Sequence, residues 1–120
     1  MKDEARRWFL QAKDDFKAAK YNFEGNILKV AAFLCQQSIE KGFKSLLIEK
    51  TDEFPKIHDL TRLAKLVEAP LKIQELCSKI NPAYIASRYP DSANKYSKSD
   101  VEKLLKYSQE VIKWLEENLN

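Results

Sequence analysis

The sequence predicts an all-α protein, an up-and-down bundle of three long and two short helices in a single domain over residues 1–120. First, two glycines and four prolines among 120 residues leave few places where a helix must break. Second, apolar residues recur at spacings of three and four, with almost none of the alternation typical of strands. Third, the chain holds no repeat, low-complexity segment or linker, and its length suits one hydrophobic core.

The first helix is expected from about Asp3 to Phe23, because one of its faces is apolar throughout. Gly25 follows this segment and is expected to supply its C-terminal stop. The inner residues of this helix are expected to be small or aromatic: Ala5, Trp8, Ala12, Phe16, Ala19 and Phe23.

The second helix is expected from about Ile27 to Glu49, and its first half is unusual. From Ile27 to Cys35 only Lys29 is polar, and a helix that is apolar all round is buried on more than one side. In so small a protein the second burial partner is expected to be another copy of the chain, with Phe33 and Leu34 at the interface of a homodimer. The core face of this helix is expected to hold the regularly spaced residues Leu28, Ala32, Cys35, Ile39, Phe43 and Leu46.

Two short helices are expected in the middle of the chain. A loop over Thr51–Ile57 precedes a helix over Asp59–Val67. Pro70 occupies a first helical position and opens the next helix, because proline lacks only an N–H that the first turn leaves unpaired. Asn81-Pro82 ends this helix, since a proline disfavours helical backbone in the residue before it.

The last helix is expected to begin at Ser99, where Ser99 and Glu102 have the spacing of a capping box. The preceding segment, Tyr84–Lys98, is expected to be the longest irregular stretch. The inner face of the last helix is expected to hold Val101, Leu104, Leu105, Ser108, Val111, Ile112, Leu115 and Leu119.

Composition and charge exclude several classes of protein. The net charge of +3 is too small to indicate nucleic-acid binding by itself. No apolar run approaches the roughly 20 residues that span a bilayer, and the charged N-terminus is unlike a secretion signal, so a cytoplasmic protein without membrane contact is expected. Cys35 and Cys77 occupy apolar helical positions and are expected to be buried reduced thiols. With His58 as the only histidine, we expect no metal site and no cofactor.

Two carboxylates stand out on the long helices. Asp15 lies beside the apolar stripe of the first helix, where a carboxylate either pairs with a lysine, caps a loop or binds a ligand or partner. Glu40 and Lys44 are four residues apart with the acid first, the favourable order for a helical ion pair. That pair is either solvated, part of an interface or part of a functional cleft.

Two further segments hold candidate site residues. His58 and Asp59 precede a short helix, so either residue is a candidate cap, and His58 is also a candidate proton carrier near neutral pH. Arg88-Tyr89-Pro90-Asp91 joins a cation, an aromatic ring and a rigid proline, a set suited to a phosphate or a partner. An ion pair of Arg88 with Asp91 or with Glu40 is an equal alternative.

These features together resemble the HEPN domain. The resemblance extends in order over nearly the whole chain and rests on Trp8–Ala12–Asp15–Ala19, Cys35-Gln36-Gln37-Ser38-Ile39-Glu40-Lys41 with Lys44 and Leu47, His58-Asp59-Leu60 with Leu63, and Arg88-Tyr89-Pro90-Asp91. It implies a bundle of four or five helices that dimerises through its long helices. It also implies two kinds of activity: pairing with a minimal nucleotidyltransferase in a toxin–antitoxin system, or RNA cleavage.

The ribonucleases of this family have a histidine four to six residues after an arginine, and that pattern is broken here. Residues 89–95 contain no histidine, and the only one, His58, precedes Arg88. We therefore expect a homodimer that binds a nucleotide or a nucleotidyltransferase, with Arg88 on phosphate and Tyr89 as a stacking surface. The expected ligand- or partner-binding set is Arg88, Tyr89, Asp91, Glu40, Lys44, Asp15 and His58. The alternatives are a metal-independent ribonuclease that uses Arg88 and His58 on RNA, and a purely structural assembly module.

Overall fold

The structure, a computed structural model, describes residues 1–88 and 96–119, and for residues 87 and 88 it describes the backbone alone. The described part is all-helical and contains no strand, which confirms the predicted fold class. Its long helices are α1 (Asp3–Glu24), α2 (Leu28–Thr51) and α6 (Lys98–Leu119). No helix within these ranges is long and apolar enough to cross a membrane.

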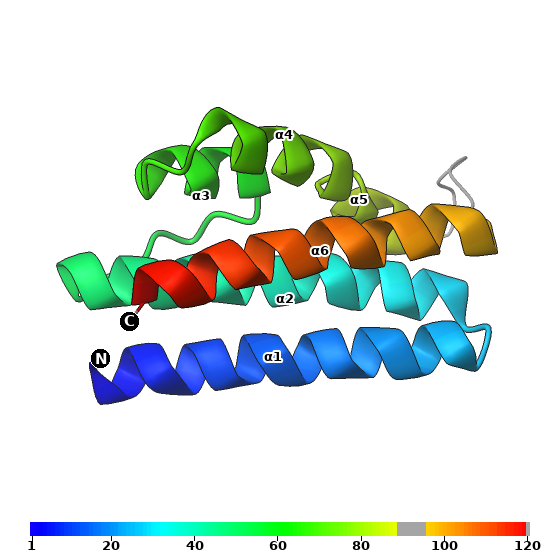
Figure 1. Cartoon of the computed structure of the whole chain (residues 1–120), viewed down its shortest axis with the longest axis horizontal. Helices are drawn as coiled ribbons and strands as arrows, with labels where there is room; N and C mark the ends of the chain where they lie inside the picture. Colours follow the sequence, from blue (N-terminus) through cyan, green and yellow to red (C-terminus); the bar gives the residue numbers. More distant parts are fainter. Residues whose placement is uncertain (89–95, 120) are drawn as a thin grey trace.

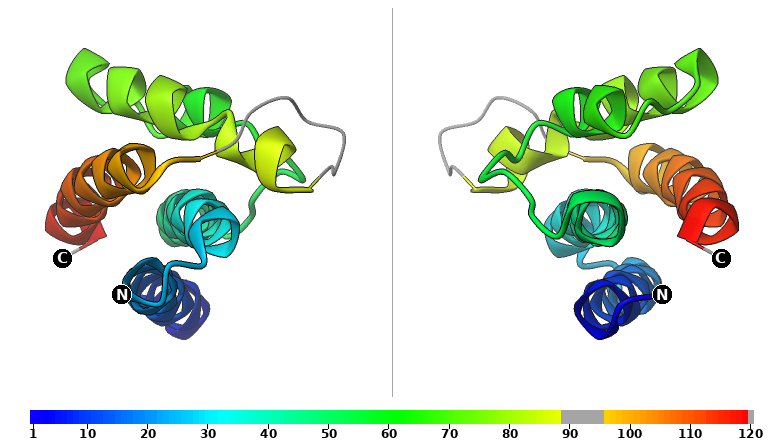
Figure 2. Two further views of the ribbon diagram at one scale, coloured as in Figure 1. Left: turned by 90° about the vertical axis from the view of Figure 1, so that its right-hand side faces the viewer. Right: turned by 90° about the vertical axis from the view of Figure 1, so that its left-hand side faces the viewer.

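Three short helices form a second layer over the long ones (Figures 1 and 2). They are α3 (Leu60–Leu66), α4 (Leu71–Ile80) and α5 (Ala83–Arg88). Helix α2 lies at the centre, in contact with α1, α3, α5 and α6, while α4 packs on α6. The core face predicted for α2 is confirmed, since Leu28 is half-buried and the other five residues of that face are fully buried: Ala32, Cys35, Ile39, Phe43 and Leu46.

Helices α1 and α2 form a hairpin that packs closely because small residues line the contact. The hydroxyl of Ser38 donates a hydrogen bond to the carbonyl oxygen of Ala12 at 2.6 Å, and the hydroxyl of Ser45 donates to that of Ala5 at 2.6 Å. Gly42 lies between the two serines, and a Cβ atom there would meet Leu115 of α6 at 2.5 Å. Both α1 and α6 therefore pack against this part of α2.

The hairpin turn lies where the sequence predicts it, but the turning residue is different. Gly25 is the C-cap of α1, yet its φ of −80° is available to any residue. The left-handed conformation belongs to Asn26, with φ of 63°. Asparagine tolerates this region better than most side chains do, so the chain turns without a glycine at that position.

The sequence offers His58 and Asp59 as candidate caps of α3, and Asp59 is the residue that caps it. Its carboxylate accepts hydrogen bonds from the backbone N–H groups of Thr61 at 3.0 Å and Arg62 at 3.4 Å. It also accepts from the side-chain amide of Asn81 at 2.9 Å, while the amide oxygen of Asn81 accepts from the N–H of Leu60. Asn81 thereby joins the end of α4 to the start of α3.

The prediction of an irregular segment from Tyr84 onward is wrong, because residues 83–88 form α5, the third short helix of the bundle. Pro82 ends α4 but directly precedes α5, and proline is well tolerated where a helix begins. Ala83 and Ala86 are buried, and α5 packs on α2. Two buried alanines carry too little hydrophobic signal to reveal so short a helix in the sequence.

The capping box of α6 lies two residues earlier than predicted. Ser97, not Ser99, is the capping residue: its N–H donates to the Asp100 carboxylate at 3.0 Å, and the N–H of Asp100 donates to its hydroxyl at 3.1 Å. The bond from the Ser97 N–H lowers the pKa of the Asp100 carboxyl. The earlier box also places Tyr96 and Val101 at the two positions of a hydrophobic staple, and both pack on the core. The box predicted at Ser99 would place lysines at those positions.

Both thiols are buried and unpaired, as predicted. Burial raises the pKa of Cys35 and of Cys77 from the ordinary value near 9 to about 12. Neither thiol lies in a group of described side chains that could hold a metal ion.

Because only the thiolate reacts readily, both thiols are expected to label slowly in the native protein and rapidly in denaturant. Following the reaction with a thiol reagent by mass spectrometry checks this expectation. Rapid labelling of the native protein at neutral pH would contradict the burial of these groups.

The raised pKa values of the two thiols also affect stability. An unfolded thiol ionises near pH 9 and the folded one near pH 12, so stability is expected to decline as the pH rises through that window.

Candidate functional site

Three polar side chains surround the carboxylate of Glu40 on α2. Its Oε2 lies 2.8 Å from the Nζ of Lys44, and both of its oxygens lie 3.0 Å from Nδ1 of His58. The side-chain amide of Gln36 donates to Oε1 at 3.3 Å. We call Gln36, Glu40, Lys44 and His58 the Glu40 cluster.

The predicted ion pair of Glu40 and Lys44 is confirmed, but it is not solvated. Lys44 is only 5% exposed, and the Glu40 side chain is 12% exposed. A buried ammonium group needs a partner, and Glu40 supplies it. The Nζ atom of Lys44 also lies 5.3 Å from the centre of the Phe54 ring, which packs edge-on against Trp8 of α1 at 4.8 Å. The polar cluster is thus joined to the apolar packing between α1 and the 52–59 loop.

His58 is held in a defined orientation although its side chain is 52% exposed. Its carbonyl oxygen accepts a hydrogen bond from Gln36 at 3.1 Å, and its ring stacks on Tyr84 with centroids 4.9 Å apart and an angle of 16°. Because the Glu40 carboxylate only accepts, Nδ1 carries the proton in this contact. The Nε2 atom has no hydrogen-bond partner among the described residues, so in the neutral ring it is a proton acceptor.

Tyr84 is a site residue that sequence reasoning missed. It lies in the segment predicted to be irregular, and its role depends on α5, which packs on α2 (Figure 2). Arg88 ends the same helix four residues later, a little over one turn or about 6 Å along its axis. The fold therefore brings the backbone of Arg88 to the region of His58, although the two residues are far apart in sequence.

Most of the predicted motif Arg88-Tyr89-Pro90-Asp91 lies outside the described residues. The structure gives the backbone of Arg88 but not its side chain, and Tyr89, Pro90 and Asp91 fall outside the described residues. The alternatives for Arg88, an ion pair with Asp91 or Glu40 or a contact with phosphate, therefore stay predictions.

Asp15 has the structural role that was one of its two expected roles. It is 7% exposed, and its Oδ2 lies 2.8 Å from the Nζ of Lys41 on α2. Gln11 and Gln37 donate to its two oxygens at 2.9 and 3.1 Å. This carboxylate joins α1 to α2, and no described contact links it to the Glu40 cluster.

The apolar first half of α2 leaves side chains uncovered in the single chain. Ile27 is 51% and Val30 43% exposed. Of the two residues predicted at a dimer interface, Leu34 is half-buried against the core of its own chain, while the half-buried Phe33 does not belong to that core. Phe33 is therefore the better candidate for contact with a second copy.

Comparison with known proteins identifies relatives of this fold. The sequence model of the HEPN domain matches residues 5–118. No curated protein matches the chain. Among solved structures, TT1696 from Thermus thermophilus superposes with a TM-score of 0.90 at 24% identity, over 98% of this chain and 100% of that one. ST0689, described as an archaeal HEPN homologue, gives a TM-score of 0.83 at 27% identity over 100% of both chains.

A third structure, an HEPN domain protein (tm0613) from Thermotoga maritima, gives a TM-score of 0.75 at 22% identity, over 92% of this chain and 95% of that one. The likeness to these structures concerns the fold, and the sequence model covers nearly every residue of the chain. The chain therefore belongs to the HEPN domain family.

Proposed function

We propose that this HEPN domain is a homodimeric binding module for a nucleotide, or for a nucleotidyltransferase partner in a toxin–antitoxin type of system. The observation that carries the proposal is the stacking of the His58 ring on Tyr84. Glu40 holds the His58 ring, and Tyr84 lies about one helical turn before Arg88 on α5. A stacked pair of rings suits a base, and an arginine suits a phosphate, so the two together match the two ends of a nucleotide.

The cation that binds an anionic ligand is expected to come from outside the pair of Lys44 and Glu40. The charge of Lys44 is offset by Glu40 at 2.8 Å, and the carboxylate is almost covered by its three partners. We expect Arg88 to supply that cation, with His58 as a second one when it is protonated. A nucleotidyltransferase that presents its own bound nucleotide would meet the same surface.

The Arg88→Ala variant tests this function. It is expected to weaken the binding of AMP, ATP or a short oligonucleotide by about 1.5–3 kcal/mol, roughly 10- to 150-fold in Kd, with little change in Tm. Isothermal titration and a thermal melt of the same variant measure both quantities. Lys17→Ala is the matched control, because Lys17 is an exposed cation of α1 with no described partner. A lower Tm with unchanged binding would mean that Arg88 is structural and would contradict the proposal.

A second candidate function, RNA cleavage, is favoured by the same stacking contact. The stacking of His58 on Tyr84 brings the only histidine of the sequence near the end of α5, where Arg88 lies. In that mechanism Nε2 of His58 would take the proton of a ribose 2′-hydroxyl, and the hydroxyl oxygen would attack the adjacent phosphorus while the bond from phosphorus to the 5′-oxygen breaks. The departing 5′-oxygen would take a proton from water, the other product would be a 2′,3′-cyclic phosphate, and Arg88 would stabilise the developing charge. Our leading proposal expects single-stranded and structured RNA to stay intact with the purified protein. Cleavage that is lost in His58→Ala would instead establish the second candidate.

The exposed apolar residues at the start of α2 support the homodimer. Phe33→Glu is expected to convert the dimer into a folded monomer, because a charge would be placed where a second copy packs. Sedimentation velocity measures the change, and Tyr21→Glu serves as the control, since Tyr21 is 77% exposed at the other side of the hairpin turn. A wild-type protein that is monomeric at high micromolar concentration would contradict the dimer.

A further inference from the structure

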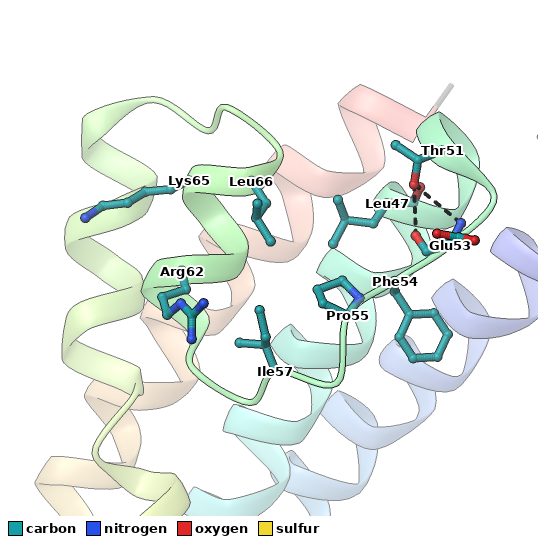
Figure 3. Close-up of a pocket in the computed structure, with 9 residues that line it drawn as sticks. All are labelled: Leu47, Thr51, Glu53, Phe54, Pro55, Ile57, Arg62, Lys65 and Leu66. Atoms are coloured by element: carbon teal, nitrogen blue, oxygen red, sulfur yellow. Dashed lines mark hydrogen bonds between the residues drawn. The ribbon is translucent and has the colours of Figure 1, made fainter.

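An open cavity of about 610 Å³ lies between the end of α2, the loop that follows it, and α3 (Figure 3). Its volume falls within the range of pockets that bind small molecules, about 300–1,000 Å³. None of the residues of the Glu40 cluster lines it, and neither does Tyr84 or Arg88. The lining residues are Leu47, Thr51, Glu53, Phe54, Pro55, Ile57, Arg62, Lys65 and Leu66.

The wall of this cavity is mostly apolar and is fixed by contacts outside it. Phe54 is held between the Trp8 ring and the Lys44 ammonium group. The hydroxyl of Thr51 donates to the carbonyl oxygens of Leu47 and Glu53 at 2.9 and 3.0 Å, which ties the loop to the last turn of α2. Leu66 faces the cavity and is 53% exposed, a position that costs free energy unless something covers it.

Charged groups lie at the two ends of the cavity. Figure 3 shows the Arg62 guanidinium beside Ile57 at one end and the Glu53 carboxylate beside Thr51 at the other, while Lys65 extends away. No hydrogen bond or ion pair from the described residues engages the side chain of Arg62 or of Glu53. A free guanidinium at the edge of an apolar cavity is complementary to a carboxylate attached to an apolar group.

We propose that this cavity binds a small apolar carboxylate, an acyl or aryl acid. The apolar part lies on Phe54, Ile57 and Leu66, and the carboxylate is bound by Arg62. Glu53 opposes the reversed orientation, because it would repel the carboxylate at its own end. This site is separate from the proposed nucleotide site, so either can fail without the other.

Titration of the full chain with octanoate, followed by amide chemical shifts in a ¹⁵N–¹H spectrum, tests the site. Octanol and octylammonium are the matched probes, since they have the same chain with a neutral or a positive end. Saturable shifts confined to residues near 47–66 are expected for octanoate. Octanol is expected to bind roughly tenfold more weakly, the loss of about one charged hydrogen bond, and octylammonium is expected to bind only in the reversed orientation, with its ammonium group toward Glu53.

Two variants assign the effect to the cavity. Arg62→Gln is expected to reduce octanoate affinity to that of octanol while octanol binding stays unchanged, whereas Lys17→Gln changes neither. Leu66→Glu is expected to abolish octanoate binding, because it adds a negative charge at the apolar wall. Both side chains are exposed, and the same spectra show whether the variants remain folded.

Equal affinities for the three probes, or octanoate affinity unchanged in Arg62→Gln, would overturn the proposal. Absence of saturable shifts near residues 47–66 would overturn it as well. Nucleotide binding measured on Arg62→Gln is expected to equal that of the wild type, which separates this site from the proposed function.

Discussion

Replacing Glu40 by alanine is expected to lower the free energy of unfolding by about 3 kcal/mol, the lower end of the range for breaking a buried ion pair. The substitution leaves the Lys44 ammonium group, 5% exposed, without its carboxylate, and it releases Nδ1 of His58 and the amide of Gln36. Urea denaturation followed by circular dichroism measures the change.

Glu102→Ala is the matched control for this prediction. Glu102 also precedes a lysine by four residues, but its pair with Lys106 is long, at 3.8 Å, and both side chains are more than half exposed. Its loss is expected to cost less than about 0.5 kcal/mol. In the double variant Glu40→Gln with Lys44→Met, most of the stability is expected to return, because no buried charge remains unpaired. If Glu40→Ala costs no more than Glu102→Ala, the pair is not effectively buried in solution.

Replacing Gly42 by valine is expected to be of similar severity, with a loss of about 3 kcal/mol or failure to fold. A Cβ atom at this position would lie 2.5 Å from Cδ1 of Leu115, which is fully buried, and near Cβ of Ala12. In Gly42→Ala, the gain in helix propensity of about 1 kcal/mol partly offsets the displacement of one Leu115 methyl group, so its loss is expected to be smaller. Chemical denaturation of the two variants gives both values.

Gly25→Ala provides the comparison for a glycine without such a constraint. A Cβ atom there would come no closer than 3.6 Å to another residue's atoms, and φ is −80°, so the change is expected to be nearly neutral. Adding Leu115→Ala to Gly42→Val is expected to recover part of the loss, since it removes the atoms that clash. A neutral Gly42→Val would mean that α2 and α6 do not pack as closely as the structure has them.

The three long helices could be predicted from sequence because each has an apolar face long enough to show its period. Short helices and capping residues were harder to predict from the sequence. Helix α5 has two buried alanines and a half-buried tyrosine, too little to register as a helix after a proline. Two overlapping serine–acid pairs with the spacing of a capping box lie at the start of α6, and the packing of Tyr96 and Val101 on the core distinguishes them.

The candidate site could be predicted where a contact is local or where a polar group borders an apolar face. The pair of Glu40 and Lys44 follows from their spacing on one helix, and Asp15 was expected to need a partner because it borders an apolar stripe. The contacts of His58 with Glu40 and Tyr84 join three separate segments, so they depend on how α5 and the 52–59 loop pack on α2. Nothing in the local sequence of His58 distinguishes it from a helix cap.

The two serine hydroxyls of α2 fix the register of the α1–α2 hairpin. Ser38 and Ser45 are two turns apart and bind carbonyl groups of α1 that are also two turns apart, so both bonds form in a single alignment. Sliding α1 by half a turn, about 2.7 Å, would break both bonds. Sliding it by a full turn would bring larger side chains, either Phe9 and Phe16 or Met1 and Trp8, to the places of Ala5 and Ala12. We therefore expect the two helices of the hairpin to move as one unit, without sliding past each other.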